Sequence, residues 1–423
     1  MPVSVDRPSA LILCAQIAAL ALARRLGQAG IGVGIWDTTP MEGLAAPAAA
    51  HSRYVRWRLS GHGRDEAAWA DQLVTAARGL GERPALIATS DEMLLLVSRQ
   101  RARLQPYYRI LLPAAETLEL LLDKRRLHEE AARRGVAVPT SIRIHSARDL
   151  DPALRELGLP CLLKSAFGKV GSVAADADLP GKVKIESRDQ LHRVYDTLSQ
   201  SESRWLLQEY LPGGAERVAL YNAYFNAQHQ PLAVFTGRKV RQYPVDFGTA
   251  SLSQACWIPG LAEPLTSFLQ QLNYIGPVDI GLKWDARQQV YKLLDVNPRL
   301  GQNYRTFVAY GLSRADLGWL TYAELAELPL NLRWPLRARP RRWKIDDHDW
   351  RSCRDLHRRG ELSLSAWVGD WLRWHCGHHE RAYWSWRDPR PLLWEWARWR
   401  QRRAAAADPP PAARPATARG VLL

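Results

Sequence analysis

Three polar side chains alternate at the end of one predicted β-strand and share a face with an acidic residue on the strand before it. Asp295, Asn297 and Arg299 occupy every second position, so they lie on one face. The other arm of the predicted hairpin presents Asp279 on that face. Carboxylate and amide oxygens suit Mg²⁺, and the planar fork of an arginine suits a phosphate or a carboxylate. The alternative is a polar ladder with a surface ion pair.

Two lysines and a loop that contains glycine precede this hairpin. Lys164 ends a short apolar run and leads into the stretch 165–172, where Gly168 and Gly171 leave backbone amides able to cradle phosphates. Lys124 stands near the start of a predicted helix. Each feature is common by itself, because solvated lysines and glycine loops occur in most proteins. Because the lysines and the glycine loop precede the acidic hairpin in the chain, the three features together indicate a site for phosphate and metal.

A nucleoside site is indicated between the lysines and the hairpin. The segment Gln208-Glu209-Tyr210-Leu211 is typical of a strand edge that contacts an adenine, and Glu216 supplies a carboxylate for a ribose. A basic strand with Arg238, Lys239 and Arg241 follows. This cluster suits a substrate carboxylate or a phosphate, and a solvated strand explains it equally well.

The elements that must hold these residues fall into two parts. The apolar runs Ala10–Cys14 and Ile31–Trp36 flank a helical stretch at Ile17–Leu26, and a further strand at Ala85–Thr89 leads into another helix. This is the βαβ pattern of a parallel sheet. The first turn lacks GxGxxG, so the dinucleotide fingerprint is absent.

After residue 110 the pattern changes. A long helical stretch is predicted at Glu116–Arg134. Two β-hairpins are predicted. One joins Val218–Phe225 to Pro231–Phe235, and the other joins Val278–Trp284 to Val290–Val296. Several antiparallel strands with few helices indicate an α+β domain.

Taken in order, the lysines, the glycine loop, the Gln-Glu-Tyr-Leu edge and the acidic strands that end in Asn-Pro-Arg resemble the ATP-grasp superfamily. Within it, the chain is similar to the carboxylate–amine ligase group that includes D-aspartate ligases. The resemblance covers about Pro113–Leu325. It implies an α/β N-terminal domain at 1–110 and an α+β ATP-grasp domain at 111–328. We expect a mainly helical, basic C-terminal extension at 329–405 and a disordered tail at 406–423.

The resemblance implies ATP and Mg²⁺ as cofactors and assigns roles by position. Arg299 would steady the transferred phosphoryl group or the acyl phosphate. Apart from the resemblance, the closeness of Arg305 to Arg299 in the sequence makes it a candidate ligand for a substrate carboxylate or a phosphate. The candidate residues are Lys124, Lys164, Ser165, Gly168, Gly171 and Ser172 for the phosphates, Gln208, Glu209, Leu211 and Glu216 for the nucleoside, Asp279, Asp295 and Asn297 for the metal, and Arg299 and Arg305 for the reacting groups.

The chain departs from the family pattern at two metal positions. Gly281 stands where a Glu is common, and Asp295 stands where the family usually has the longer Glu. Asp279, two residues before Gly281 on the same face, replaces the first carboxylate with a shifted geometry. The number of metal ions therefore stays open, and a module that binds nucleotide without ligating substrates is an alternative.

The expected activity is an ATP-dependent ligation of a small carboxylate to an amine. A carboxylate has no leaving group that an amine can displace, so transfer of the γ-phosphoryl group first makes an acyl phosphate. Such a site needs positioning and charge neutralisation. The products are an amide, ADP and phosphate, and a cell-wall precursor is one candidate substrate.

Composition separates the front of the chain from its end. The 423 residues carry 58 Lys and Arg against 43 Asp and Glu, a net charge of +15. Residues 331–423 hold 20 basic and 10 acidic side chains and 11 of the 18 Trp, which leaves only +5 for the first 330 residues. The charge of the front part is accounted for by phosphate-binding positions, which disfavours a nucleic-acid-binding protein. Five scattered Cys and the lack of an apolar window of about 18 residues predict a cytoplasmic protein.

The basic end of the chain has competing interpretations. A helix at Pro391–Arg403 groups Trp and Leu beside arginines, which suits peripheral contact with an anionic membrane. The alternative, which we favour from the sequence, is that this helix docks its Trp face on the rest of the protein. A zinc site is a further hypothesis for this part, but it is disfavoured because the spacing of its candidate ligands matches no familiar structural zinc pattern. The candidate ligands are Cys353, His357, His375, Cys376, His378 and His379.

Overall fold

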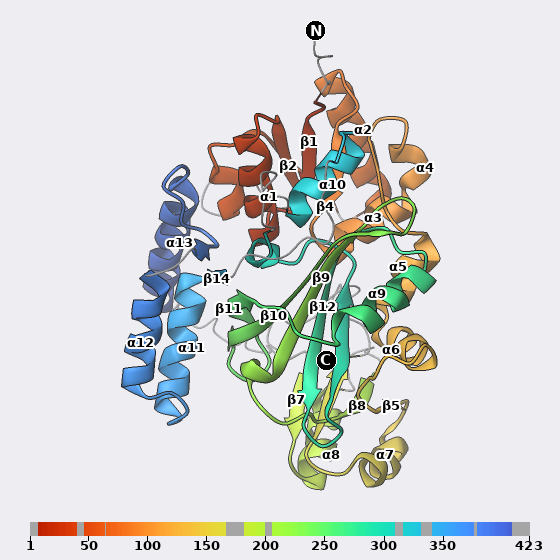
Figure 1. Cartoon of the computed structure of the whole chain (residues 1–423), viewed down its shortest axis with the longest axis vertical. Coiled ribbons are helices and arrows are strands. Elements are labelled where there is room, and N and C mark those ends of the chain that lie inside the picture. The colour runs from red at the N-terminus through yellow and green to blue at the C-terminus, as the bar shows by residue number, and fades with distance from the viewer. Residues whose placement is uncertain are drawn as a thin grey trace, which may run out of the picture.

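The computed structural model arranges the chain around three β-sheets. It describes residues 7–39, 46–63, 65–165, 182–198, 205–308, 316–330, 341–375 and 379–407. In Figure 1 the N-terminal unit lies at the top, a long twisted sheet occupies the centre, and a small sheet lies at the bottom. The last helices of the chain run along one side.

The N-terminal unit is a four-stranded parallel sheet, as the βαβ pattern predicts. Its order is β3 (Val55–Ser60), β2 (Val33–Asp37), β1 (Ala10–Leu13) and β4 (Ala85–Ala88). Because β1 and β4 are buried at every residue, they consist of apolar runs without alternation. The helices that accompany this sheet are α1 (Ile17–Gln28), α2 (Glu66–Leu80), α3 (Asp91–Arg99) and α4 (Arg101–Leu104), and the short 3-10 helix η2 spans Ala48–His51.

The large sheet has seven strands and includes both predicted hairpins. All neighbours are antiparallel except the last pair. Helices α5 (Ala115–Leu122), α6 (Lys124–Arg133) and α9 (Ala262–Gln271) contribute to the core on one side of it. The strand order is β13 (Val290–Asn297), β12 (Gly276–Asp285), β9 (Val218–Phe225), β10 (Pro231–Tyr243), β11 (Thr249–Ala255), β14 (Arg342–Lys344) and β15 (His379–Arg381).

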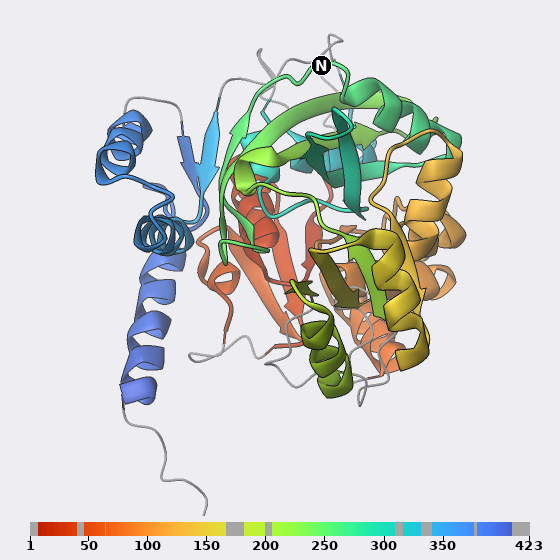
Figure 2. The same ribbon diagram turned by 90° about the horizontal axis from the view of Figure 1, so that it is seen from below.

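The small sheet is antiparallel and has its own core. Its order is β5 (Ser141–Ile144), β8 (Trp205–Glu209), β6 (Cys161–Ser165) and β7 (Lys182–Ile185), packed with α7 (Leu150–Leu157) and α8 (Arg188–Leu198). Seen from below, this sheet faces the large one (Figure 2). Strands β6 and β7 place Lys164 directly opposite Lys182.

The helical stretch predicted at Glu116–Arg134 is broken, which corrects the sequence-based expectation of one helix. It divides at Asp123, whose carboxylate accepts hydrogen bonds from the backbone N–H groups of Arg125 (2.9 Å) and Arg126 (3.0 Å). An aspartate is a strong N-cap because it satisfies donors that a helix start leaves unpaired. The break places Lys124 at the first turn of α6.

The chain beyond residue 340 adds to the large sheet instead of forming a separate layer. Strand β14 pairs with β11, and β15 pairs with β14. The helices here are α11 (Asp346–Arg358), α12 (Leu364–His375) and α13 (Arg390–Ala407). Helix α10 (Leu317–Leu325), which precedes them, shares a core with α1. No helix within the described ranges combines the length and the apolar character needed to cross a membrane.

Candidate active site

Strands β12 and β13 bring the predicted acidic residues together. Their register pairs Asp279 with Asn297 and Gly281 with Asp295. A Cβ atom at Gly281 would lie 2.5 Å from Asp295 Oδ1, so the Asp295 carboxylate occupies the space above the glycine. The absence of a side chain at 281 is therefore what allows Asp295 to reach over β12.

Asp279 is held by two amides. Asn222 Nδ2 on β9 donates to Asp279 Oδ1 over 2.9 Å, and Asn297 Nδ2 lies 3.4 Å from Asp279 Oδ2. Desolvation, together with the negative charge of Asp295, raises the pKa of Asp279 to about 6. Two neighbouring carboxylates and an amide form an oxygen donor set that fits Mg²⁺, whose charge would relieve their repulsion.

A cluster of lysines surrounds this pair of carboxylates. Burial, together with the positive charges of Lys124 and Lys182, lowers the pKa of Lys164 to about 7. Desolvation also lowers the pKa of Lys239, which Asp295 and Asp279 partly offset. The members come from five elements and are Lys124 on α6, Lys164 on β6, Lys182 on β7, Lys239 on β10 and Lys283 on β12.

Positive charge exceeds negative charge in this region. Desolvation lowers the pKa of Lys283 to about 8, although Glu216 acts in the opposite direction. Among the described residues, the carboxylates that act on this lysine cluster are Asp279, Asp295 and Glu216. Lysines that depress one another's pKa form a site that an anion with several charges stabilises. Of the five lysines, sequence reasoning assigned Lys124 and Lys164 to the phosphates and left Lys239 open between an anion ligand and a solvated position, whereas it gave Lys182 and Lys283 no role.

Arg299 connects the acidic strands to the N-terminal unit. Its Nε donates to Asp91 Oδ1 over 2.6 Å, and Asp91 is the first residue of α3. Arg305, which was expected to bind substrate, lies elsewhere: its guanidinium pairs with Asp316 and, through Nε at 2.9 Å, with Glu380. The positive charge of Arg299 acts on Asp279 and lowers its pKa, whereas Arg305 is engaged by Asp316 and Glu380.

The residues predicted for the nucleoside lie on β8 and in the turn after it. Gln208 is buried and its Nε2 donates to Ser141 Oγ over 2.7 Å. Leu211 is buried as well. The Glu209 carboxylate is engaged by Lys292 Nζ at 2.8 Å and by Arg287. This leaves Glu209 as part of an ion-pair network between β8 and the β12–β13 hairpin.

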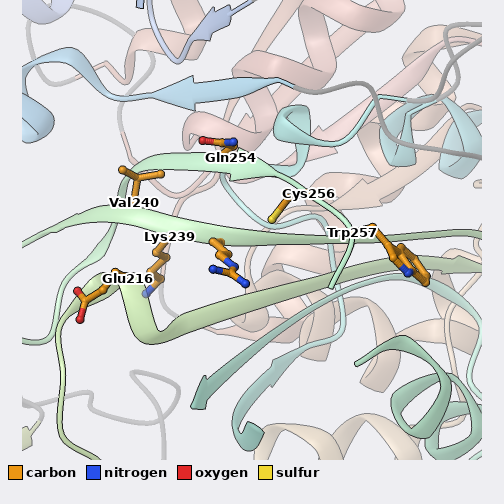
Figure 3. A pocket seen from close by; sticks show the side chains of 7 residues that line it. Glu216, Lys239, Val240, Gln254, Cys256 and Trp257 are labelled. Atoms are coloured by element: carbon orange, nitrogen blue, oxygen red, sulfur yellow. The ribbon is translucent and has the colours of Figure 1, made fainter. Parts of the chain in front are cut away.

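Glu216 lines a cavity of about 420 Å³ together with residues of β10 and β11. Figure 3 shows Glu216 next to Lys239 at this cavity. Arg238 lines it too and is exposed. Arg241, from the same basic strand, does not line the cavity, because its Nε pairs with Asp349 Oδ1 at 2.7 Å. The basic strand is thus divided between the cavity and a contact with α11.

Part of the predicted phosphate loop lies outside the described residues. This applies to Gly168, Gly171 and Ser172 and to the side chain of Ser165, so their roles stay predictions. Two members of the zinc hypothesis, Cys376 and His378, are outside as well. The part of the chain that the structure describes contains no group of three or more His, Cys, Asp or Glu placed to hold a metal ion.

Comparisons with known proteins bear on the fold of the chain. No protein-family model matches the chain. A D-aspartate ligase of Enterococcus faecium (strain Aus0004) is 23% identical over 240 residues, which span 54% of this chain and 56% of that protein, so the match extends over little more than half of the relative.

Two solved structures share the fold. One is the biotin carboxylase domain of the 2-oxoglutarate carboxylase of Hydrogenobacter thermophilus, in complex with MgADP, ADP and bicarbonate. It has a TM-score of 0.60 and 14% identity, and the match covers 79% of this chain and 73% of that one. The other is an L-amino acid ligase of Bacillus licheniformis, with a TM-score of 0.56, 14% identity and coverage of 76% and 75%. At these identities the likeness establishes the fold.

Proposed function

This chain has the ATP-grasp fold, and we propose that it is an ATP-dependent ligase that joins a carboxylate to an amine. The observation that carries the proposal is the cluster of five lysines around Asp279 and Asp295, at the place where the small sheet faces the large one. A triphosphate supplies negative charge that balances the excess positive charge of these lysines. The carboxylates supply ligands for the cation that accompanies ATP.

We assign the nucleotide to the region between the two sheets. Lys124, Lys164 and Lys182 contact the phosphates, since the charge of Lys124 lowers the pKa of both Lys164 and Lys182 and the charge of Lys182 lowers that of Lys164. The adenine lies near Gln208 and Leu211 on the edge of β8, and Glu216 accepts hydrogen bonds from the ribose hydroxyls. Glu209 orients this edge through Lys292 and is not itself a nucleotide ligand.

Asp279, Asp295 and Asn297 would hold Mg²⁺. When bound, the ion neutralises charge on the phosphate oxygens. The Nε of Arg299 is fixed by Asp91, and its remaining N–H groups hold the phosphoryl group during transfer. Lys239 and Lys283 provide further positive charge on the side of the large sheet.

The reaction follows from these positions. A carboxylate oxygen of the substrate attacks the γ-phosphorus of ATP, and ADP leaves with the electron pair of the broken bond. The acyl phosphate then carries phosphate as its leaving group. The amine nitrogen attacks the acyl carbon, phosphate departs, and the nitrogen loses a proton. The protein binds, orients and neutralises charge, which is most of what phosphoryl transfer requires.

The substrates that we propose are a small carboxylate and an amine, at least one of them an amino acid. The cavity beside Glu216 and Arg238 is adjacent to the lysine cluster, and the guanidinium of Arg238 suits a substrate carboxylate. Similarity to a D-aspartate ligase makes D-aspartate the first amino acid to test.

A screen for ADP release over pairs of carboxylates and amines tests the proposal. We expect ADP to form only when both substrates are present, and Lys182→Met to lower the rate at least about tenfold because one phosphate contact is lost. Lys184→Met is the matched control, because Lys184 lies on the same strand and pairs with Glu186 at 2.7 Å. Nucleotide binding without ADP release for any pair would favour the non-catalytic module.

A further inference from the structure

Three carboxylates of the C-terminal part of the chain, residues 341–407, pair with arginines in the rest of the protein. Asp349 and Asp370 both pair with Arg241, which is 7% exposed. Asp388 is fully buried, and Arg24 Nε lies 2.9 Å from its Oδ2. The negative charge of this part is therefore used in docking.

Its outer surface is apolar and basic. Of the eleven large hydrophobic side chains that are exposed within the described residues, nine lie in this part, although it forms a small fraction of the chain. Trp386 is 86% exposed. The nine are Trp350, Leu364, Val368, Trp371, Leu372, Trp386, Leu393, Trp396 and Trp399.

Helix α12 shows this arrangement most clearly, because it is apolar on two faces. Trp374 is buried, and Lys344 Nζ lies 4.2 Å from the centre of its ring. Leu364, Val368 and Leu372 recur at every fourth position and therefore share another face, where each is about half exposed or more. A helix whose second apolar face meets only water loses the stabilisation that burial of that face would give.

Arginines accompany this surface. Four exposed arginines form no ion pair with any described residue, and they are Arg358, Arg387, Arg390 and Arg400. The guanidinium of Arg400 lies over the ring of Trp396, 5.0 Å from its centre. Exposed carboxylates in the same part are Asp347 and Glu361. The surface thus combines an excess of positive charge with Trp, Leu and Val.

We propose that this surface, formed by the outer faces of α12 and α13 and the segment around Trp386, binds an anionic lipid membrane peripherally. Figures 1 and 2 both show α12 and α13 along the same side of the molecule. Trp and aliphatic side chains enter the interfacial layer of a bilayer while arginines meet the headgroups.

A membrane fits these residues better than a nucleic acid or a second copy. Single-stranded nucleic acid uses aromatic rings for stacking and cations for phosphates, and it leaves the face formed by Leu364, Val368 and Leu372 without a role. Two copies would bring basic surfaces together, since residues 331–423 carry a net charge of +10. The charge is complementary to lipid headgroups that are negative.

Co-sedimentation of the full chain with lipid vesicles tests this inference without ATP or substrate, so its outcome is independent of the ligase activity. We expect binding to phosphatidylcholine vesicles that contain phosphatidylglycerol, weaker binding in high salt, and little binding to phosphatidylcholine alone. The variant Leu364→Ser/Val368→Ser/Leu372→Ser should lower the apparent affinity by about tenfold or more. Arg387→Glu/Arg390→Glu should weaken binding to the anionic vesicles specifically.

Leu159→Ser is the matched control, because Leu159 is an exposed leucine on the small-sheet side of the molecule, at 46% exposure. If the triple variant does not fold, Leu372→Ser alone replaces it, with thermal unfolding as the check. Equal vesicle binding by the control and the α12 variant would overturn the proposal. Absence of vesicle binding would also overturn it, as would binding to single-stranded DNA only or a dimer that the α12 variant dissociates.

Discussion

Lys164 and Lys292 are both buried lysines on strands, yet they differ in what surrounds the ammonium group. Lys292 Nζ lies 2.8 Å from Glu209 Oε2 and 3.0 Å from Asp285 Oδ2. None of the described residues forms an ion pair with Lys164, and its nearest charges include Lys124 and Lys182. Replacing each lysine by methionine, which keeps most of the side-chain volume, should therefore have opposite effects on the free energy of unfolding.

The magnitude for Lys164 follows from its pKa. That pKa falls from 10.5 to about 7 in the folded protein, and one pKa unit corresponds to about 1.4 kcal/mol, so keeping the ammonium charged costs up to about 5 kcal/mol. At pH 8 the folded protein holds Lys164 mostly neutral while the unfolded chain holds it charged, and the cost is about 3 kcal/mol. We expect Lys164→Met to stabilise the protein without nucleotide, by at least about 1 kcal/mol after packing losses.

The pH dependence has a definite sign. Between pH 7 and 10.5 the unfolded chain binds more protons at this lysine than the folded protein does, so the contribution of Lys164 to wild-type stability becomes more favourable as the pH rises. The increase in the free energy of unfolding that Lys164→Met causes is largest at or below pH 7 and becomes smaller toward pH 10.5. In contrast, Lys292→Met leaves Glu209 and Asp285 with one cation fewer and should destabilise by about 3 kcal/mol or more.

Urea unfolding of both variants and the wild type at pH 7 and pH 9, without nucleotide, measures these differences. Circular dichroism follows the unfolding transition, and equal slopes of free energy against urea show that the comparison is valid. If Lys164→Met destabilises the protein as much as Lys292→Met does, the claim that Lys164 lacks a counter-ion until an anion binds is refuted.

Three further predictions concern the site and its supports. ATP binding at pH 8 should take up about one proton, because the phosphates raise the lowered pKa of Lys164. Calorimetry in two buffers with different ionisation enthalpies measures this uptake. Binding without proton uptake would count against the assignment of Lys164 to the phosphates. Asp295→Asn should lower Mg²⁺-dependent ADP formation at least about a hundredfold, while ATP binding without Mg²⁺ stays equal or tightens, since a negative charge has been removed; unchanged turnover would exclude Asp295 as a metal ligand. Arg24→Ala should destabilise by about 3 kcal/mol or more, because it leaves Asp388 buried without its cation; a loss below about 1 kcal/mol in urea unfolding would show that the C-terminal part is docked by other contacts.

The parts of the site that the sequence revealed are those whose neighbours are local. Asp279, Asp295 and Asn297 lie on consecutive strands, and alternation places them on one face before any tertiary contact is known. The fold was predicted through the resemblance to ATP-grasp proteins, and the structural likenesses confirm it. The start of a helix near Lys124 was predicted and is confirmed, but its separation from the helix before it was not predicted, because the apolar pattern continues across Asp123.

Long-range partners account for what the sequence did not reveal. Lys182 faces Lys164 through the pairing of β6 with β7, which no local pattern indicated. Asn222 reaches Asp279 from β9, 57 residues earlier. Arg241 and Arg305 were reasonable substrate ligands by type and position, yet their partners Asp349 and Glu380 are 108 and 75 residues away. An arginine in a sequence does not show whether its partner is a substrate or a distant carboxylate.

Transfer of labelled oxygen tests the proposed chemistry most directly. With a substrate pair identified, the carboxylate is supplied with ¹⁸O in both oxygens, and the products are followed by ³¹P NMR. The acyl-phosphate route predicts that one ¹⁸O of the carboxylate appears in inorganic phosphate, together with ADP. Label in AMP, with release of pyrophosphate, would contradict the account, as would phosphate that carries no label.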